Sequence, residues 1–296
     1  MEVEVQPSTK DFTFWHAYLS DHPRPNYSIG KWPRRSSYSG TSYIVRYSGL
    51  RYISQAPPFH VIPEGDCASG VTGSALQHRL EKIDIVLGAP HLGRNGDEAQ
   101  DIVGLFLEYL AIRIRYPPLM VTATPVKDFL RTVQESSQDA LAHAIPWHLL
   151  LESLNITPEL PDPPLFDVVV SYHDDFGRIA MPGIEAKPVY AWTEGAKFKL
   201  MVEFVVATDA SLLMRLEYSD ECFDTRSIAI LGRSIVTALD LIVDGISHEV
   251  IKRRLSATQD EDGDAVCPES WSKSDTQVTR HPPHAPPLFE AIAKPI

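Results

Sequence analysis

An imidazole followed by two carboxylates stands at the end of an apolar segment, in "YHDD" (172–175). A histidine beside ionised aspartates can take up a proton from a substrate, which is general acid–base chemistry. His173 is therefore the one residue for which we consider a catalytic role, with Asp174 and Asp175 as its partners. The alternative is that the two aspartates turn the chain before Gly177, as Asp pairs commonly do.

A second acid stands on the apolar face of a predicted strand. Residues 106–115 alternate, and one face carries Phe106, Glu108, Leu110, Ile112 and Ile114. Burying a carboxylate among such neighbours costs several kcal/mol unless it is hydrogen-bonded or reaches water. Arg113 lies on the opposite face, so it cannot pair with Glu108 within the strand. The strand is therefore expected to line an opening or to lie at the edge of its sheet.

The remaining histidines and the cysteines do not show the spacing of a metal site. His143 and His148 are separated by Pro146, which prevents both from lying on one face of a continuous helix. The three cysteines are far apart and contain no CxxC pair. We expect neither a disulfide framework nor a bound metal.

The strands and helices that would position these side chains are recognised by the spacing of their apolar residues, which alternate in a strand and recur every three or four residues in a helix. Strands are predicted at 83–88, 106–115, 166–173, 197–208 and 211–219, and helices within 127–144, from Pro146 onward and after Asp224. Gly88 is expected to end the first strand and Gly245 the last helix, while 20–65 should hold short strands and loops. The fold class is α/β, a mixed sheet with helices on one face.

Composition excludes several classes of protein. With 44% hydrophobic residues, 22% charged residues and no long apolar run, the chain does not resemble a membrane protein. A net charge of -12 disfavours binding to nucleic acid. No P-loop, GxGxxG or GxSxG is present, which argues against nucleotide binding and serine hydrolysis. The first residues lack the features of a secretory signal, so a cytoplasmic location is expected.

Three motifs in order resemble those of the condensation domains of nonribosomal peptide synthetases. "VGLFLEYLAIR" (103–113) is similar to the family pattern [IV]GxFxNxLxxR through Gly104, Phe106, Leu110 and Arg113, with Glu108 in place of Asn. "HAIPWH" resembles the next motif through His143, Pro146 and Trp147, and "PDPPLFDVVVSYH" (161–173) resembles the last. The resemblance is greatest to fungal synthetases that make cyclic dipeptides or related small peptides.

The resemblance implies a fold and a set of site residues. Family members have two lobes similar to chloramphenicol acetyltransferase, and substrates borne on the phosphopantetheine of carrier domains enter a tunnel between them. The chain would supply the second lobe, with 1–20 as a remnant of the lobe junction, 21–255 as the lobe and 256–296 as a disordered tail or linker. The residues expected at the tunnel or in its motifs are Gly104, Phe106, Glu108, Arg113, His143, Pro146, Trp147 and Asp174.

The family's catalytic histidine belongs to an HHxxxDG motif, and no two histidines adjoin in this sequence. Amide formation between carrier-bound substrates is therefore expected only with a partner lobe, and no cofactor is expected to bind directly. Two alternatives are a module that binds carrier proteins without catalysis, and a single-lobe acyltransferase that uses His173. The expected partners are carrier domains, the first lobe and a second copy of the chain meeting the exposed seam.

Overall fold

The computed structural model describes residues 7–20, 32–47, 64–80, 84–93, 107–115, 125–173, 192–193, 195–206, 211–243 and 276–277. None of the helices in these ranges is both long and apolar enough to cross a bilayer.

The strands form one mixed sheet, in agreement with the predicted fold class. They are β1 (Gly40–Tyr47), β2 (Asp84–Leu92), β3 (Leu107–Arg115), β4 (Val168–His173), β5 (Leu200–Val206), β6 (Leu212–Ser219) and β7 (Thr276–Gln277). In the described part of the chain their order is β3-β2-β4-β5-β6-β1-β7. β4 runs parallel to β2 and β5, and the other pairs are antiparallel. The predicted hairpin of β5 and β6 is confirmed.

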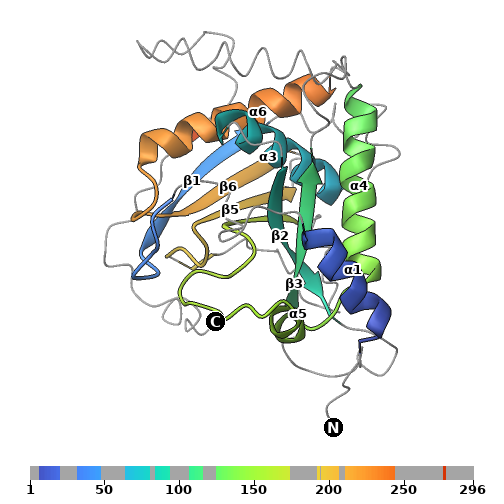
Figure 1. Cartoon of the computed structure of the whole chain (residues 1–296). Helices are drawn as coiled ribbons and strands as arrows, with labels where there is room; N and C mark the ends of the chain where they lie inside the picture. Colours follow the sequence, from blue (N-terminus) through green and yellow to red (C-terminus); the bar gives the residue numbers. More distant parts are fainter. Residues whose placement is uncertain are drawn as a thin grey trace, which may run out of the picture.

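The helices lie against this sheet as Figure 1 shows. They are α1 (Thr9–Leu19), α3 (Glu64–Leu80), α4 (Val126–Ala142), α5 (Trp147–Ser153) and α6 (Thr225–Val243). The predictions of α4, α5 and α6 are confirmed, including the N-cap of α6, where the Ser227 amide donates to Asp224 Oδ1 at 2.7 Å. Gly245, which was expected to end α6, lies outside the described residues.

Helix α3 was not predicted from the sequence. Glycine, serine and threonine are frequent in it and lower its intrinsic helix propensity. Every residue from Asp66 to Gln77 is buried, so the segment lacks the polar face that makes a surface helix recognisable. Its glycines allow close packing: a Cβ at Gly73 would lie 2.9 Å from Ile114 of β3. Tertiary contacts therefore stabilise this helix against its local preference.

The two faces of the sheet differ in chemistry. Towards α6 the strands present apolar side chains, and a Cβ on Gly232 of α6 would lie 3.2 Å from the ring of Tyr43. Residues in register with Tyr43 on this face are Leu216 and Val202. The alternating positions, Glu203 and Arg215 among them, point to the other face.

Strand β2 is longer than predicted, and the expectation that Gly88 ends it is wrong. The strand continues through Gly88 to Leu92 and pairs with β3 along its whole length. The glycine is needed for space, because a Cβ there would lie 2.5 Å from the ring of Phe166.

Candidate functional site

A row of charged side chains crosses the sheet on the face turned away from α6. His173 of β4 lies with Nε2 2.9 Å from Glu203 Oε1, and Arg215 of β6 donates through Nε to Glu203 Oε2 at 2.8 Å. The same guanidinium donates through Nη1 to Glu217 Oε2 at 2.9 Å. We call His173, Glu203, Arg215 and Glu217 the polar row. It arises because β4, β5 and β6 are neighbours in register, so alternate residues of each strand meet.

The polar row is buried over most of its length. The side chains of Glu203, Arg215 and Glu217 are 9%, 6% and 3% exposed, whereas that of His173 is 34% exposed. Charges at such depth are tolerated when each is paired and hydrogen-bonded. The backbone amide of Lys197 donates to Glu217 Oε1 at 3.0 Å, and the Arg215 guanidinium lies 5.7 Å from the centre of the Trp192 ring. Among these four side chains, the His173 imidazole is the one that reaches the surface.

The imidazole of His173 is already engaged at its tip. Nε2, the ring nitrogen farthest from the backbone, lies 3.0 Å from the Ser171 hydroxyl as well as 2.9 Å from Glu203. A general base must offer a nitrogen within hydrogen-bond reach of the substrate proton. The nitrogen best placed to reach a substrate is thus committed to the sheet.

Glu108 lies on an edge strand of the sheet that the described residues form, one of the two positions expected for it. β3 is the outermost strand in the order, and Glu108 Oε2 accepts a hydrogen bond from the Trp147 amide at 3.2 Å. Across the β2–β3 pair Glu108 faces His91, whose pKa is lowered by burial and raised less strongly by the Glu108 charge. The pKa of Tyr109 is raised by its own burial and by Glu108. The acid is therefore hydrogen-bonded and close to the surface, and it pairs with no cation on its own strand.

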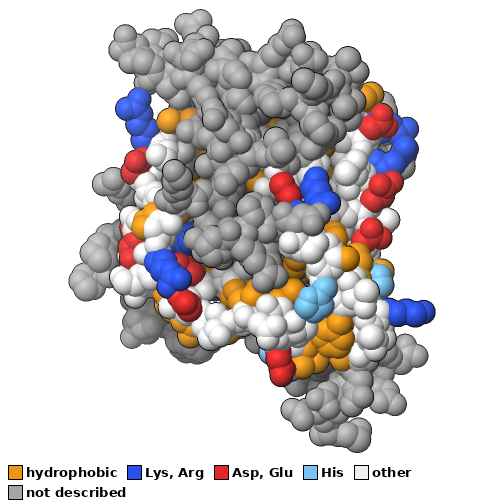
Figure 2. Space-filling view, in the orientation of Figure 1, with side chains coloured by type: hydrophobic (Ala, Val, Ile, Leu, Met, Phe, Trp, Pro, Cys, Tyr) orange, Lys and Arg blue, Asp and Glu red, His pale blue; other side chains and the backbone are white. Residues whose placement is uncertain are grey.

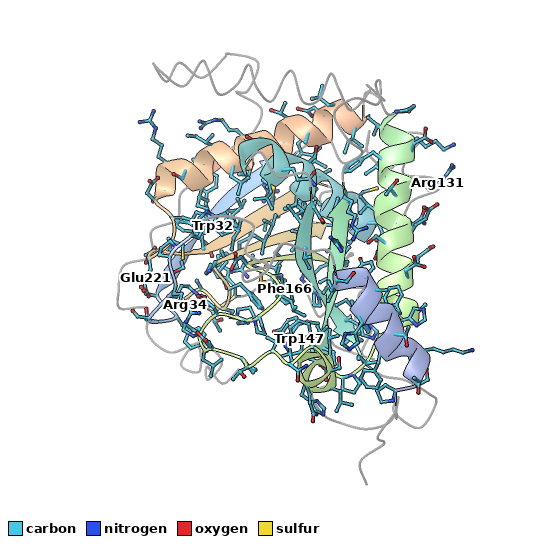
Figure 3. All side chains as sticks on the ribbon, viewed as in Figure 1. Trp32, Arg34, Arg131, Trp147, Phe166 and Glu221 are labelled. Carbon is cyan, nitrogen blue, oxygen red and sulfur yellow. The ribbon has the colours of Figure 1, made fainter. Side chains whose placement is uncertain are left out.

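Trp147 anchors an aromatic cluster beside Glu108. Its ring lies 5.9 Å from Tyr109 and 5.4 Å from Phe166, and Phe198 lies 5.6 Å from Tyr109. Figure 3 shows Trp147 and Phe166 approaching each other from α5 and the segment before β4. Pro146 is the N-cap residue of α5, so the proline of the motif starts the helix that carries Trp147.

Arg113 and His143, two further residues of the motifs, do not reach this cluster. Arg113 binds Asp84 of β2 through Nε at 2.9 Å and Nη2 at 2.5 Å, a bidentate ion pair. His143 follows α4, and its Nδ1 lies 2.9 Å from Asp11 Oδ1 of α1. Both residues also contact α1 through other atoms.

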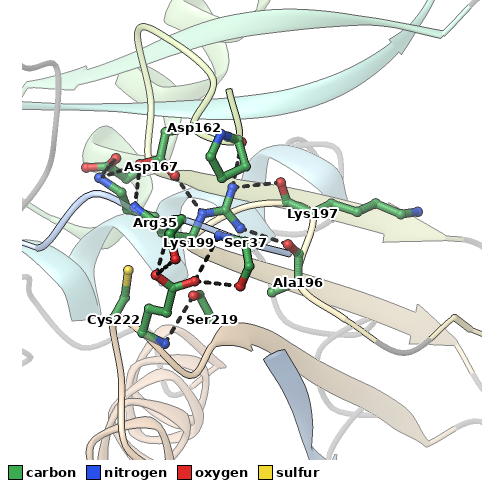
Figure 4. A network of polar contacts seen from close by, with 12 residues as sticks. Arg35, Ser37, Asp162, Asp167, Ala196, Lys197, Lys199, Ser219 and Cys222 are labelled. Carbon is green, nitrogen blue, oxygen red and sulfur yellow. Dashed lines mark hydrogen bonds and ion pairs between the residues drawn. The ribbon is translucent and has the colours of Figure 1, made fainter. Parts of the chain in front are cut away.

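A second buried polar cluster joins three segments distant in sequence (Figure 4). Arg35 donates to Asp162 Oδ1 at 2.6 Å and to the carbonyl of Ala196 at 2.7 Å. Lys199 pairs with Asp167 at 2.9 Å. The cluster holds the loop before β4 against the segment before β1, and its charges balance within it. Its role in the fold is to fix the loop that carries Phe166.

The structure thus divides the predicted site residues among separate places. Glu108 and Trp147 meet at the sheet edge, His173 joins the polar row, and Arg113 and His143 meet at α1. Gly104, Phe106 and Asp174 lie outside the described residues. Within the described ranges no three of His, Cys, Asp and Glu are grouped as metal ligands.

Sequence reasoning missed the inner members of the polar row, Glu203, Arg215 and Glu217. A signal was available: Glu203 and Arg215 lie on the alternate, non-apolar face of two strands already predicted to form a hairpin. Opposite charges at facing positions of neighbouring strands are expected to pair.

Comparison with known proteins gives consistent results. A family model described as "Condensation domain" matches residues 69–262. Nonribosomal peptide synthetase ataP of Aspergillus terreus is 34% identical over 87% of the chain, and the match covers 17% of that protein. Nonribosomal peptide synthetase aclP of Aspergillus oryzae is 32% identical over 85% of the chain and 16% of its own length. The chain therefore spans about a sixth of the length of these relatives.

Solved structures show the same fold. The condensation domain of the monacolin K polyketide synthase MokA superimposes with a TM-score of 0.65 at 16% identity, covering 81% of this chain and 58% of that one. The four-domain nonribosomal peptide synthetase holo-AB3403 gives a TM-score of 0.66 at 16% identity, over 81% of this chain and 20% of that one.

Proposed function

The chain belongs to the condensation-domain family, and from that premise we propose that it supplies the second lobe of a peptide-bond-forming condensation domain in a fungal nonribosomal peptide synthetase. The observation that carries the proposal is the extent of the structural match. Most of this chain, 81%, aligns with only 58% of a solved condensation domain. The remaining part of such a domain would then come from a separate lobe, joined in the same polypeptide or bound to it.

The reaction that we propose is transfer of a donor acyl group from its thioester to the amine of an aminoacyl thioester. The amine nitrogen attacks the thioester carbonyl, a C–N bond forms, the C–S bond breaks, and the donor carrier leaves as its thiol. The amine must lose a proton during this step, and a positioned base accelerates it by about 10²–10⁴-fold. Both substrates would arrive on the phosphopantetheine arms of carrier domains, so that the chain itself needs no bound cofactor.

We assign the base to the partner lobe rather than to this chain. Nε2 of His173 is engaged by Ser171 and Glu203, and Glu203 is paired with buried Arg215. Nε2 held in this way would have to give up its contact with Glu203 before it could accept a substrate proton. The proposed role of His173 is to close the exposed end of the polar row.

Glu108 and the aromatic cluster are proposed to form part of the substrate channel wall. Trp147 and Tyr109 offer partly exposed aromatic surface, and Glu108 lies next to them with its oxygen on the Trp147 amide. An apolar wall with one placed polar group is typical of sites for small molecules. A cytoplasmic location remains a prediction from the sequence.

The test is a reconstituted condensation followed by mass spectrometry of the carrier-bound product. The chain is mixed with one carrier loaded with a donor and one loaded with an aminoacyl acceptor, with and without a first lobe that contains HHxxxDG. We expect dipeptidyl thioester only when that lobe is present, and a loss of about 10²–10⁴-fold when its second histidine is replaced by alanine.

Two variants of this chain separate the alternatives. H173A should keep the rate of the reconstituted reaction within about threefold of wild type, as should H148A, a control at an exposed histidine of α5. Amide formed by the chain alone and abolished by H173A would instead establish a single-lobe acyltransferase. Carrier binding without product in either mixture would favour the non-catalytic module.

A further inference from the structure

Helix α1 has only 11 residues, too few to be stable in isolation. It begins with a capping box in which Ser8 and Asp11 exchange hydrogen bonds. Its persistence in the fold therefore depends on what holds it. Two residues that the sequence motifs single out, Arg113 and His143, both form hydrogen bonds with it.

His143 holds the first half of the helix at three points. Its Nδ1 lies 2.9 Å from Asp11 Oδ1, and its carbonyl accepts a hydrogen bond from Trp15 Nε1 at 2.7 Å. Its ring stacks on Phe14 with the centres 4.2 Å apart and the planes inclined by 19°. Trp15 itself is buried. His143, directly after α4, therefore contacts the side of α1 that carries Phe14 and Trp15.

Arg113 holds the last turn. Its Nη1 donates to the carbonyl of Tyr18 at 2.5 Å, at the helix end where carbonyls lack intrahelical partners and a cation is favoured. Its own backbone amide donates to Tyr18 Oη at 2.7 Å, and its carbonyl accepts from Ser136 Oγ of α4 at 2.6 Å. Tyr18 and Ser136 therefore bind the outer edge of β3 where a further strand would otherwise pair.

The same two segments are joined a second time through the proposed channel wall. Glu108 lies on β3 with Arg113, and Trp147 lies four residues after His143. Their hydrogen bond, at 3.2 Å, links β3 to the start of α5, and α1 links the same strand to the end of α4. A shift of α1 would change the distance between β3 and the start of α5, which the Glu108–Trp147 hydrogen bond joins.

We propose that α1 is a brace that sets the positions of Glu108 and Trp147, with His143, Arg113 and Tyr18 as its positioning residues. These residues act through α1 and do not touch substrate. The functional half of this inference rests on the proposed condensation reaction, whereas the mechanical half rests on the contacts alone.

Hydrogen–deuterium exchange tests the mechanical half on the full chain. H143Q removes the stacked ring and its bond to Asp11, and Y18F removes the hydroxyl that binds Arg113 and Ser136. Both should speed exchange of the α1 amides by about tenfold, because each variant loses about the net stabilisation that one hydrogen bond provides. The exchange rates of the β5 and β6 amides should not change. The matched controls are H148Q on α5 and Y38F at a half-exposed tyrosine.

Two results would overturn this half of the inference. Exchange of α1 at the wild-type rate in both variants would show that the contacts do not hold the helix. Acceleration of α1 together with β5 and β6 would show that the variants weaken the whole fold and that α1 is no separate brace.

The reconstituted condensation tests the functional half. Here H143Q and Y18F should lower kcat by about tenfold or more and leave KM for the loaded carriers unchanged. The reason is that displaced Glu108 and Trp147 would orient the bound substrates less well without weakening their binding. An unchanged kcat in variants whose α1 exchanges faster would refute a positioning role. Absence of product with the wild-type chain would count against the proposed reaction, and the exchange measurement would still decide whether the brace exists.

Discussion

Arg215 is the residue on which the polar row depends, since it compensates two carboxylates at once. Its guanidinium bonds both Glu203 and Glu217, and all three side chains are less than one-tenth exposed. Removing a partner from a buried ion pair leaves an uncompensated charge, which is far more costly than the pair is stabilising.

We therefore expect R215M to lower the free energy of unfolding by about 3–5 kcal/mol. Urea denaturation followed by circular dichroism would measure the change. R131M, at an exposed arginine of α4, is the matched control and should change stability by less than about 0.5 kcal/mol. A loss for R215M no larger than that of the control would mean that water or rearrangement compensates the two glutamates.

Glu221 is an exposed carboxylate whose titration can be predicted. Hydrogen bonds from Ser37 and Ser36 lower the pKa of Glu221 from 4.5 to about 2. Because the pKa is lower in the folded chain, ionised Glu221 stabilises the fold above pH 4.5, and this contribution is lost as the pH falls from 4.5 to about 2.

S37A should accordingly raise the pKa of Glu221 towards 4.5, which a carboxyl NMR titration would detect. S39A is the control, because the Ser39 hydroxyl donates to Asp220 instead. A pKa for Glu221 that stays near its lowered value in S37A would show that the Ser36 contacts and the remaining backbone amide at position 37 suffice.

Among the elements, α3 and β2 depend on small residues. The buried helix packs against β3 and α4 through glycines, and β2 passes Phe166 at Gly88. Local propensity opposes both arrangements, so their stability comes from packing. The room for an added methyl group differs from glycine to glycine, so alanine substitutions at a crowded and at an open position can be compared.

G88A should destabilise the fold by about 1–3 kcal/mol, because the added Cβ would lie 2.5 Å from the Phe166 ring in a filled core. G65A adds the same methyl group on α3, where the nearest neighbour is Tyr172 Cβ at 4.0 Å. Its expected effect is stabilisation by up to about 1 kcal/mol through helix propensity. Thermal unfolding of both variants would compare them directly, and equal melting temperatures would contradict the packing argument.

At the scale of the whole molecule, apolar surface remains uncovered at the end of the β2–β3 pair. Leu92 and Leu107 face each other in register and are 66% and 44% exposed. Figure 2 shows further apolar side chains over α5 and the neighbouring end of α1. Acidic and basic side chains are instead interspersed along α4 in the same view. Adjacent exposed apolar residues of this kind mark contact surfaces or cause association.

The chain is therefore expected to self-associate when no partner lobe is present, and L92S/L107S should reduce the mass seen by light scattering at about 50 µM. L160S removes a more exposed leucine elsewhere, at 84% exposure, and is the control. A monodisperse wild-type monomer at that concentration would contradict the prediction.

The sequence by itself determined the α/β class, most strands, three helices and the motifs of the family. Those features follow from local periodicity, from the Asp224 cap and from Pro146, which act within a few residues. It also limited Glu108 to an edge or an opening, because an acid in an apolar row has few tolerable positions, and the strand order of the described residues places it on an edge strand. Only the tertiary structure decided which residues distant in sequence meet, because local periodicity carries no information on such contacts. Only strand order brings His173, Glu203 and Arg215 into one row, and only packing makes α3 a helix and directs Arg113 and His143 to α1.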